Sequence, residues 1–222
     1  TLRALRHHGG VDFRLGPNLE AVRLGLENAC AHLDAIQRLG LEPPVVAINR
    51  FTDDGADELA LTKQTLASRG CQVVEAEHFA QGGRGCEALA NAVMKHLADH
   101  PDDSPGLVRP YELTDSLRHK IERVAQVVFG ARDVVLSPQA ASDLSAIEAA
   151  SFGALPICVA KTHLSISDDP KVLARPSPFT LRVTGLRLSA GAGFVVVLAG
   201  PVLTMPGLPE IPSACRVDVE RD

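Results

Sequence analysis

Apolar residues recur every three or four positions in several stretches of the chain, which predicts amphipathic helices. The longest such stretch spans residues 18–39, with Pro17 before it and Gly40 after it. The same spacing predicts further helices over residues 56–68, 86–98, 114–130 and 137–150. The last of these begins with Ser137 and Pro138, which are favourable residues for a helix cap and a first turn.

Short continuous apolar runs alternate with these helices and predict strands that are covered on both faces. Residues 45–48 and 155–160 are such runs, and residues 71–74 and 133–136 are predicted as further short strands. Strands that alternate with helices at this spacing imply right-handed crossovers and a parallel sheet. After residue 179 apolar and polar positions alternate, which predicts a β-rich C-terminal tail that closes an edge of the sheet. The sequence therefore indicates an α/β protein of parallel-sheet, Rossmann-like strand–helix units.

Composition narrows the class of protein. The formal net charge of −5 argues against a broad nucleic-acid-binding surface, and no apolar run is long enough to cross a bilayer. The five cysteines are far apart and form no Cys-x-x-Cys pair, so no zinc site is expected. We expect reduced, mostly buried thiols in a cytoplasmic protein.

Two phenylalanines lie where the first two predicted strands end. Open parallel sheets bind ligands beyond the carboxyl ends of their strands, and Phe51 and Phe79 both lie beside polar loops there. Because the chain has only 7 Phe, one Tyr and no Trp, the pair is a candidate for the walls of a slot for a flat ring. The alternative, which the pattern alone favours, is that both are core side chains packed under loops.

Two polar segments at strand ends also have two interpretations. The glycine-rich residues 82–85 precede a helix. They are typical either of a turn whose backbone binds an anion or of a purely structural turn. Residues 161–170 contain Ser165 and Ser167, which alternate around one isoleucine, together with Lys161 and an Asp-Asp-Pro sequence. They suit either phosphate and ribose contacts or an ordinary turn.

Several motifs, in order, resemble those of the formate–tetrahydrofolate ligases (10-formyltetrahydrofolate synthetases). Residues 1–10, TLRALRHHGG, are similar to the end of the family pattern Val-Ala-Thr-Val-Arg-Ala-Leu-Lys-x-His-Gly-Gly. The other matching stretches are residues 45–54, 80–85, 155–170, 189–194 and 204–209. Since the signature's first residues would precede residue 1, we expect the chain to be the C-terminal portion of a longer protein. We place a boundary between residues 1–43, the end of a nucleotide-binding domain, and residues 44–222, an α/β domain.

The resemblance implies an enzyme that joins formate to tetrahydrofolate with ATP and Mg²⁺, through formyl phosphate, on a fold related to the P-loop NTPases. It implies a pterin sandwich between Phe51 and Phe79, where the second wall is Trp in the family. It also implies adenine contacts from Ser165, Ser167 and Pro170. The expected partners are these small-molecule substrates, with no nucleic acid and no membrane, and the full-length protein is expected to be a homotetramer.

The family's P-loop and its other glycine-rich signature are expected before the opening motif, so catalytic groups are expected outside these residues. We therefore expect no turnover from the chain alone. The alternative is a non-catalytic fragment or paralogue that binds folate or nucleotide, or a structural partner.

Overall fold

The computed structural model describes residues 1–100, 107–202 and 209–216. Within these ranges, every helix is too short or too polar to span a membrane. The motif at residues 204–209 falls almost entirely outside them.

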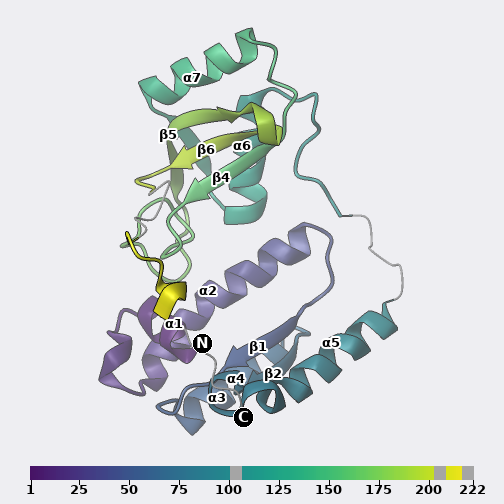
Figure 1. Cartoon of the computed structure of the whole chain (residues 1–222), viewed down its shortest axis with the longest axis vertical. Helices are drawn as coiled ribbons and strands as arrows, with labels where there is room; N and C mark the ends of the chain where they lie inside the picture. The colour runs from purple at the N-terminus through teal and green to yellow at the C-terminus, as the bar shows by residue number, and fades with distance from the viewer. Residues whose placement is uncertain (101–106, 203–208, 217–222) are drawn as a thin grey trace.

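The N-terminal half of the chain forms one lobe, in which helices pack on a two-stranded sheet (Figure 1). Its elements are α1 (Leu2–His8), η1 (Phe13–Leu15), α2 (Leu19–Arg38), β1 (Val45–Asn49), α3 (Ala56–Ala67), β2 (Gln72–Ala76), α4 (His78–Gln81), η2 (Gly82–Cys86) and α5 (Glu87–Asp99).

The helix predicted over residues 18–39 is confirmed as α2. The side chain of Asn18 caps it by accepting a hydrogen bond from the amide of Ala21 at 2.9 Å. The apolar face of α2 packs on the sheet through Val22 and Leu26, which cluster with Leu66 of α3. This packing ties α2 to the β1–β2 lobe.

The opening motif folds as helix α1, which begins with a helix cap that was not predicted from the sequence. The hydroxyl of Thr1 accepts a hydrogen bond from the amide of Ala4 at 3.1 Å, and the helix ends before Gly9. Glycines let α1 approach α2 closely. A Cβ built on Gly9 would lie 2.0 Å from the carbonyl oxygen of Ala21, and one built on Gly25 would lie 1.9 Å from that of Leu5.

Strands β1 and β2 pair in parallel, as the alternation of strands and helices predicts. The expectation that the first strand is covered on both faces is wrong in this chain, because Ala47 is exposed. Together the two strands form a sheet of their own rather than part of one continuous sheet.

The C-terminal half forms a second lobe around a four-stranded sheet (Figure 1). The elements of this lobe are α6 (Leu117–Val124), η3 (Ala125–Phe129), β3 (Asp133–Leu136), α7 (Pro138–Ala149), β4 (Ile157–Lys161), β5 (Thr180–Ser189), η4 (Ala190–Ala192) and β6 (Phe194–Ala199). The last described element of the chain is η5 (Ser213–Arg216). Ser137 caps α7 and Pro138 occupies its first turn, as predicted.

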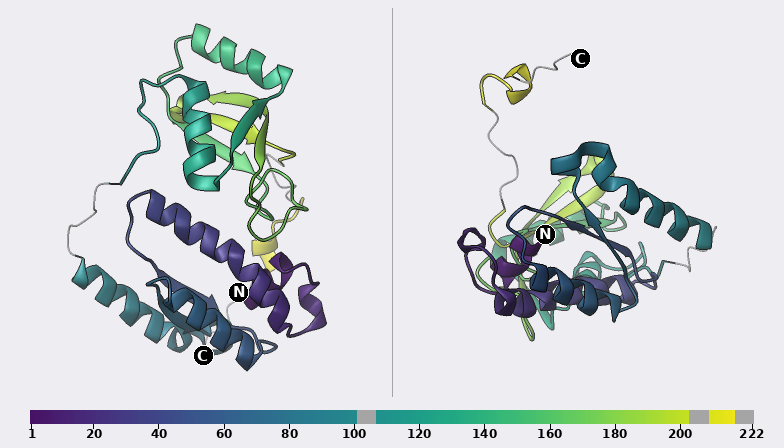
Figure 2. Two further views of the ribbon diagram at one scale, coloured as in Figure 1. Left: turned by 180° about the vertical axis from the view of Figure 1, so that it is seen from behind. Right: turned by 90° about the horizontal axis from the view of Figure 1, so that it is seen from below.

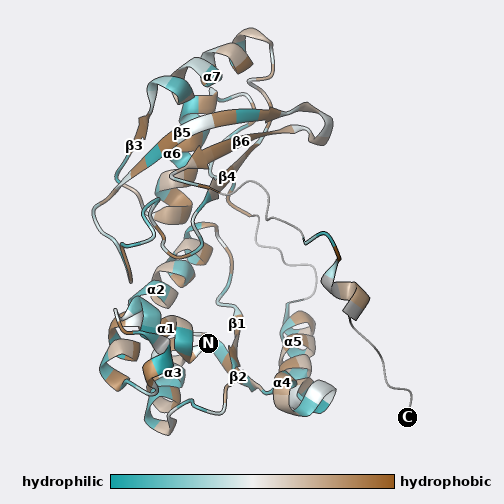
Figure 3. Cartoon of the chain, turned by 60° about the vertical axis from the view of Figure 1, so that its left-hand side comes forward, coloured by the Kyte–Doolittle hydropathy of each residue, from teal (hydrophilic) through white to brown (hydrophobic). Residues whose placement is uncertain are grey.

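The order of the strands corrects the prediction for the tail. The sheet runs β3-β5-β6-β4, so the two late strands lie in its middle and do not close its edge. They pair with each other in antiparallel fashion and with β3 and β4 in parallel. Their inward side chains, Val183, Val195 and Val197, are almost fully buried in the core of the lobe. In Figure 3 β6 is hydrophobic along its length, whereas β5 alternates hydrophobic and hydrophilic residues.

Helix α2 connects the two lobes. It extends from the first lobe toward the second, as the opposite views of Figures 1 and 2 show, and it packs against η3. Arg38 donates from Nε to the carbonyl of Val127 at 2.7 Å, and Asn28 donates to the carbonyl of Ala174 at 3.1 Å. The same Ala174 donates its amide to Nδ1 of His8 at 3.3 Å. The proposed boundary between residues 43 and 44 stays a prediction, although α2 lies in the same lobe as β1.

The cysteines correct part of the prediction that the thiols are mostly buried. Cys30 and Cys71 are buried, and burial raises the pKa of both thiols. Cys86 is half-buried, whereas Cys158 and Cys215 are exposed. Cys158 is exposed because β4 is an edge strand rather than the fully covered strand that its apolar sequence predicts.

Candidate functional site

Phe51 lies in the turn that joins β1 to α3. The turn is closed by Asp54, whose Oδ2 accepts a hydrogen bond from the amide of Phe51 at 2.8 Å. The Phe51 ring is half-buried, and the guanidinium carbon of Arg3 lies 4.0 Å from the ring centroid. The side chain is therefore held in a loop rather than packed into the lobe's core.

Phe79 lies on the short helix α4, directly after β2. Its side chain is 88% exposed, so the alternative that it is a core residue is wrong for Phe79. The glycine-rich turn holds this segment in place, because Gly85 accepts a hydrogen bond from the amide of Glu77 at 2.9 Å. A Cβ on Gly85 would lie 2.5 Å from the carbonyl of Glu77, whereas Gly83 has open space around it. The structural interpretation of the turn therefore accounts for Gly85.

The two phenylalanines line one pocket of about 390 Å³. Arg3 comes from α1, and the other lining residues come from the segments that follow β1 and β2: Arg50, Phe51, Thr52, Glu77, Phe79 and Ala80. The structure thus brings together the two aromatic residues predicted from the strand ends. Two arginines and a carboxylate surround them.

A buried ion-pair network lies behind this pocket. Arg6 of α1 is fully buried, and it donates from Nε and Nη2 to the two oxygens of Glu58 at 2.9 and 2.7 Å. The same Glu58 accepts the amides of Asn18 and Gly55 at 2.6 and 2.9 Å. Arg6 also contacts Oδ2 of Asp53 at 3.3 Å. The network therefore joins α1, α2 and α3 to the turn that carries Phe51.

The predicted nucleotide segment forms a compact turn between β4 and β5. Ser165 and Ser167 are 5% and 3% exposed, and their hydroxyl oxygens lie 3.0 Å apart. The Ser165 hydroxyl also donates to the carbonyl of Val172, while the oxygen of Ser167 accepts the amide of Asp169 at 3.1 Å. Both hydroxyls therefore shape the turn from within, and Pro170 lies half-buried beside them.

The charged side chains of this segment form hydrogen bonds with neighbouring groups of the protein. The Lys161 ammonium donates to the carbonyls of Thr162, Ser165 and Ser167, and burial lowers its pKa. Asp168 is 4% exposed and accepts a hydrogen bond from Nε of Arg182 at 2.9 Å. In this structure these two charges stabilise the turn.

A second pocket, of about 230 Å³, lies where this turn faces the first lobe. Lys161 and Ile166 line it together with His32 and Arg175, and Phe129 forms an apolar part of its wall. The ammonium of Lys161 lies 5.1 Å from the centroid of the Phe129 ring. The predicted nucleotide segment thus borders a pocket, although Ser165, Ser167 and Pro170 do not line it.

The described ranges contain no group of three or more His, Cys, Asp or Glu residues arranged to hold a metal ion. We therefore assign no residue of these ranges to the Mg²⁺ expected with ATP.

The sequence analysis missed Arg3, Arg6 and Glu58. Arg6 and Glu58 are 52 residues apart, and no local pattern pairs them. The one available signal was the spacing of Arg6, four residues after the apolar Leu2, which places both on one side of a helix.

Comparisons with known proteins agree with the motifs. The family model for formate–tetrahydrofolate ligase matches residues 1–222. Curated relatives named formate–tetrahydrofolate ligase are 43% identical over 224 residues in a Nocardioides species, 43% over 225 in Myxococcus xanthus and 42% over 223 in Thermus thermophilus. Each alignment covers 100% of this chain and 40% of the relative, so the chain spans about two fifths of the relatives' length. With a family model that covers all of its residues and relatives at 42–43% identity, this chain belongs to the formate–tetrahydrofolate ligase family.

Proposed function

We propose that this chain supplies the tetrahydrofolate pocket of an ATP-dependent ligase that joins formate to tetrahydrofolate. The pocket between Phe51 and Phe79 carries this proposal. A pterin is a flat ring with polar edges, and aromatic side chains stack well on such rings. The 88% exposure of Phe79 also supports it, because a bound ring would cover a large apolar surface that the chain leaves in water.

We propose that the turn containing Ser165, Ser167 and Pro170 lies beside the adenine of ATP. The two serine hydroxyls are engaged within the turn, so their role would be to fix its backbone rather than to donate to the base. The neighbouring Ile166 is buried and lines the second pocket, which supports an apolar contact at this place.

The proposed reaction has two steps. Formate attacks the terminal phosphate of ATP, which gives formyl phosphate and ADP. The N10 amine of tetrahydrofolate then attacks the formyl carbon and phosphate leaves. Phosphoryl transfer needs groups that stabilise the transferred phosphate, and we place those groups in the part of the relatives that this chain does not cover.

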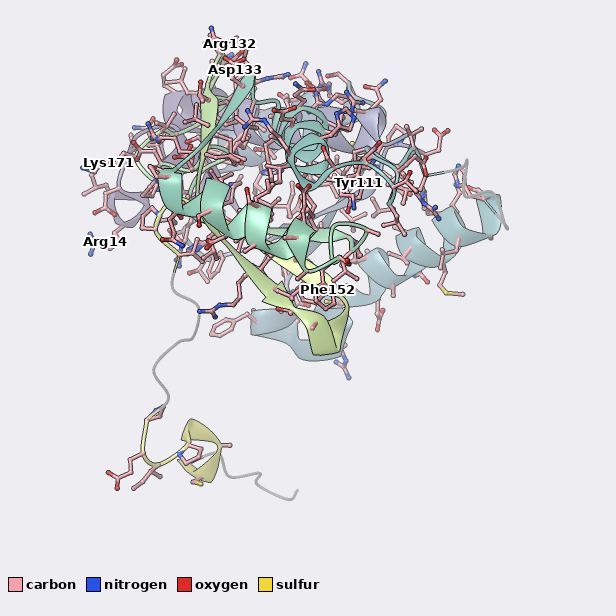
Figure 4. The ribbon with its side chains drawn as sticks, turned by 90° about the horizontal axis from the view of Figure 1, so that it is seen from above. Arg14, Tyr111, Arg132, Asp133, Phe152 and Lys171 are labelled. Atoms are coloured by element: carbon pink, nitrogen blue, oxygen red, sulfur yellow. The ribbon has the colours of Figure 1, made fainter. Side chains whose placement is uncertain are left out.

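Replacing Phe79 with alanine is expected to weaken tetrahydrofolate binding by about tenfold or more, since one stacking wall is lost. Phe79→Trp is expected to tighten binding, because indole offers a larger face. Isothermal titration calorimetry of the chain with tetrahydrofolate measures both effects. Phe152→Ala is the matched control, because Phe152 is 36% exposed and lies in the other lobe (Figure 4). Unchanged affinity in Phe79→Ala would remove the pocket from the proposal.

The chain alone is expected to form no 10-formyltetrahydrofolate from ATP, formate and tetrahydrofolate. The measurement is product formation over time, with the full-length Thermus thermophilus relative as positive control. Turnover by the chain would show that the phosphate-binding groups lie within it. Binding of tetrahydrofolate without turnover fits the proposal, whereas binding of neither substrate would favour a structural role.

A further inference from the structure

Arg3 occupies a distinctive place in the pocket that Phe51 and Phe79 line. It stands on α1, one turn before the buried Arg6, and its guanidinium carbon lies 4.0 Å from the centroid of the Phe51 ring. Its Nη2 donates to Oδ1 of Asp53 at 2.6 Å. The hydrogen bond from Arg3 is also the main reason why the pKa of Asp53 is lowered, so this carboxylate stays charged. Arg3 is thus held over the Phe51 ring by its bond to the charged Asp53.

The rest of the Arg3 guanidinium is not satisfied by the described part of the chain. Its Nε is buried, and no group in the described residues accepts its hydrogen. Arg50, from the end of β1, differs: among the described residues its buried Nε has no hydrogen-bond partner, but it lies 3.7 Å from Oδ2 of Asp54, and Nη1 pairs with Glu75. Leaving a buried charged donor without an acceptor is costly. The unsatisfied Nε–H of Arg3, which borders the pocket, therefore indicates that a ligand supplies its acceptor.

The two arginines differ in what surrounds them. Arg50 contacts Glu75 and lies 3.9 Å from Glu77, so its charge is already balanced by carboxylates. Within the described ranges Arg3 has Asp53 as its one carboxylate partner, and Asp53 is shared with Arg6. Arg3 also contacts the Phe51 ring with its guanidinium group while its Nε–H has no acceptor among the described residues. It is therefore the better placed of the two to bind the edge of a ring that stacks on Phe51.

We propose that Arg3 is a specificity-determining residue of this pocket, which donates its free Nε–H to an acceptor atom, an oxo group or ring nitrogen, on a planar heteroaromatic ligand. This inference rests on the proposed function, which identifies that ligand as the pterin of tetrahydrofolate. Phe51 and Phe79 then recognise the flatness of the ring, while Arg3 recognises its acceptor edge. A pterin whose 4-oxo group is replaced by an amino group presents a donor there and is rejected.

The test compares the affinities of tetrahydrofolate and its 4-amino analogue for the chain and for Arg3→Lys and Arg3→Gln. Lysine keeps the charge but lacks the planar fork of donors, and glutamine removes the charge. The chain itself is expected to prefer the 4-oxo ring by about tenfold or more. Both variants are expected to lose about tenfold in affinity for tetrahydrofolate and to lose this preference. Arg14→Lys is the control, because Arg14 pairs with Asp12 on the surface (Figure 4) and does not line the pocket.

Each other outcome has one meaning. If the chain binds tetrahydrofolate and both Arg3 variants keep the affinity and the preference, the inference is wrong while the proposed function stands. If the variants lose affinity for both rings equally, with unchanged thermal unfolding, Arg3 is a stacking platform only and the proposed recognition of the acceptor edge is refuted. If the unchanged chain binds neither ring, the proposed function itself fails.

Discussion

Replacing Arg6 with methionine is expected to destabilise the chain by about 3–5 kcal/mol, the usual cost of leaving a buried charge without its partner. Glu58 is 1% exposed and would keep only the amides of Asn18 and Gly55 as donors. The free energy of unfolding, taken from urea titrations followed by circular dichroism, measures the loss. Arg14→Met is the matched control, because Arg14 makes a surface pair with Asp12 and should change stability by less than about 1 kcal/mol. A small effect of Arg6→Met would show that the network does not hold the lobe together.

The acid dependence of stability provides a second measurement on the same pair. Burial alone raises the pKa of Glu58. The hydrogen bonds from Arg6, Asn18 and Gly55 and the charge of Arg6 together lower it by a larger amount, so its pKa is below the ordinary value of 4.5. A carboxylate with a lowered pKa stabilises the folded state above its ordinary pKa, and this contribution is lost as the pH falls through the lowered value. The unchanged chain is therefore expected to lose stability below about pH 4.5. In Arg6→Met this loss should be smaller. Without Arg6, only the amides of Asn18 and Gly55 oppose the rise that burial causes in the pKa of Glu58.

Much of the local structure follows from the sequence because local signals suffice for it. The three- and four-residue spacing predicts α2, and Ser137 with Pro138 predicts the start of α7. The aromatic pair at the ends of β1 and β2 also follows from a local rule, since parallel strands place their carboxyl ends at one edge. In these cases the residues that decide the outcome are close together in the chain or governed by one repeated geometry.

The features that the sequence does not predict depend on distant partners. The late strands β5 and β6 lie in the middle of their sheet because β3 and β4, from earlier in the chain, pair on their outer sides. The pairing of Arg6 with Glu58 and of Arg3 with Asp53 joins residues 52 and 50 positions apart. Contacts between residues so far apart in the chain produce no periodic pattern in the sequence that would predict them. The pocket's walls were therefore predictable, whereas the arginines around them were not.

Substituting Gly25 with alanine is expected to separate α1 from α2. The new Cβ would lie 1.9 Å from the carbonyl oxygen of Leu5 and 2.7 Å from its carbonyl carbon, and backbone atoms cannot rotate away as a side chain does. Alanine favours a helix over glycine by about 1 kcal/mol, but forced displacement in packed regions typically costs about 1–3 kcal/mol and occasionally more. Since the overlap is with backbone, we expect a net destabilisation of roughly 2 kcal/mol or more, measured as a lower Tm and a lower free energy of unfolding.

The effect should extend to the pocket, because α1 carries both Arg3 and Arg6. If α1 moves away from α2, Arg3 can no longer lie against Phe51, so Gly25→Ala is expected to weaken tetrahydrofolate binding even where the variant remains folded. Gly191→Ala is the matched control: Gly191 has open space around the position of a Cβ and lies in the other lobe. A Gly25→Ala variant with unchanged Tm and unchanged affinity would contradict the close packing of α1 on α2. Loss of affinity with little loss of stability would instead show that the position of α1, rather than the overall fold, sets the geometry of the pocket.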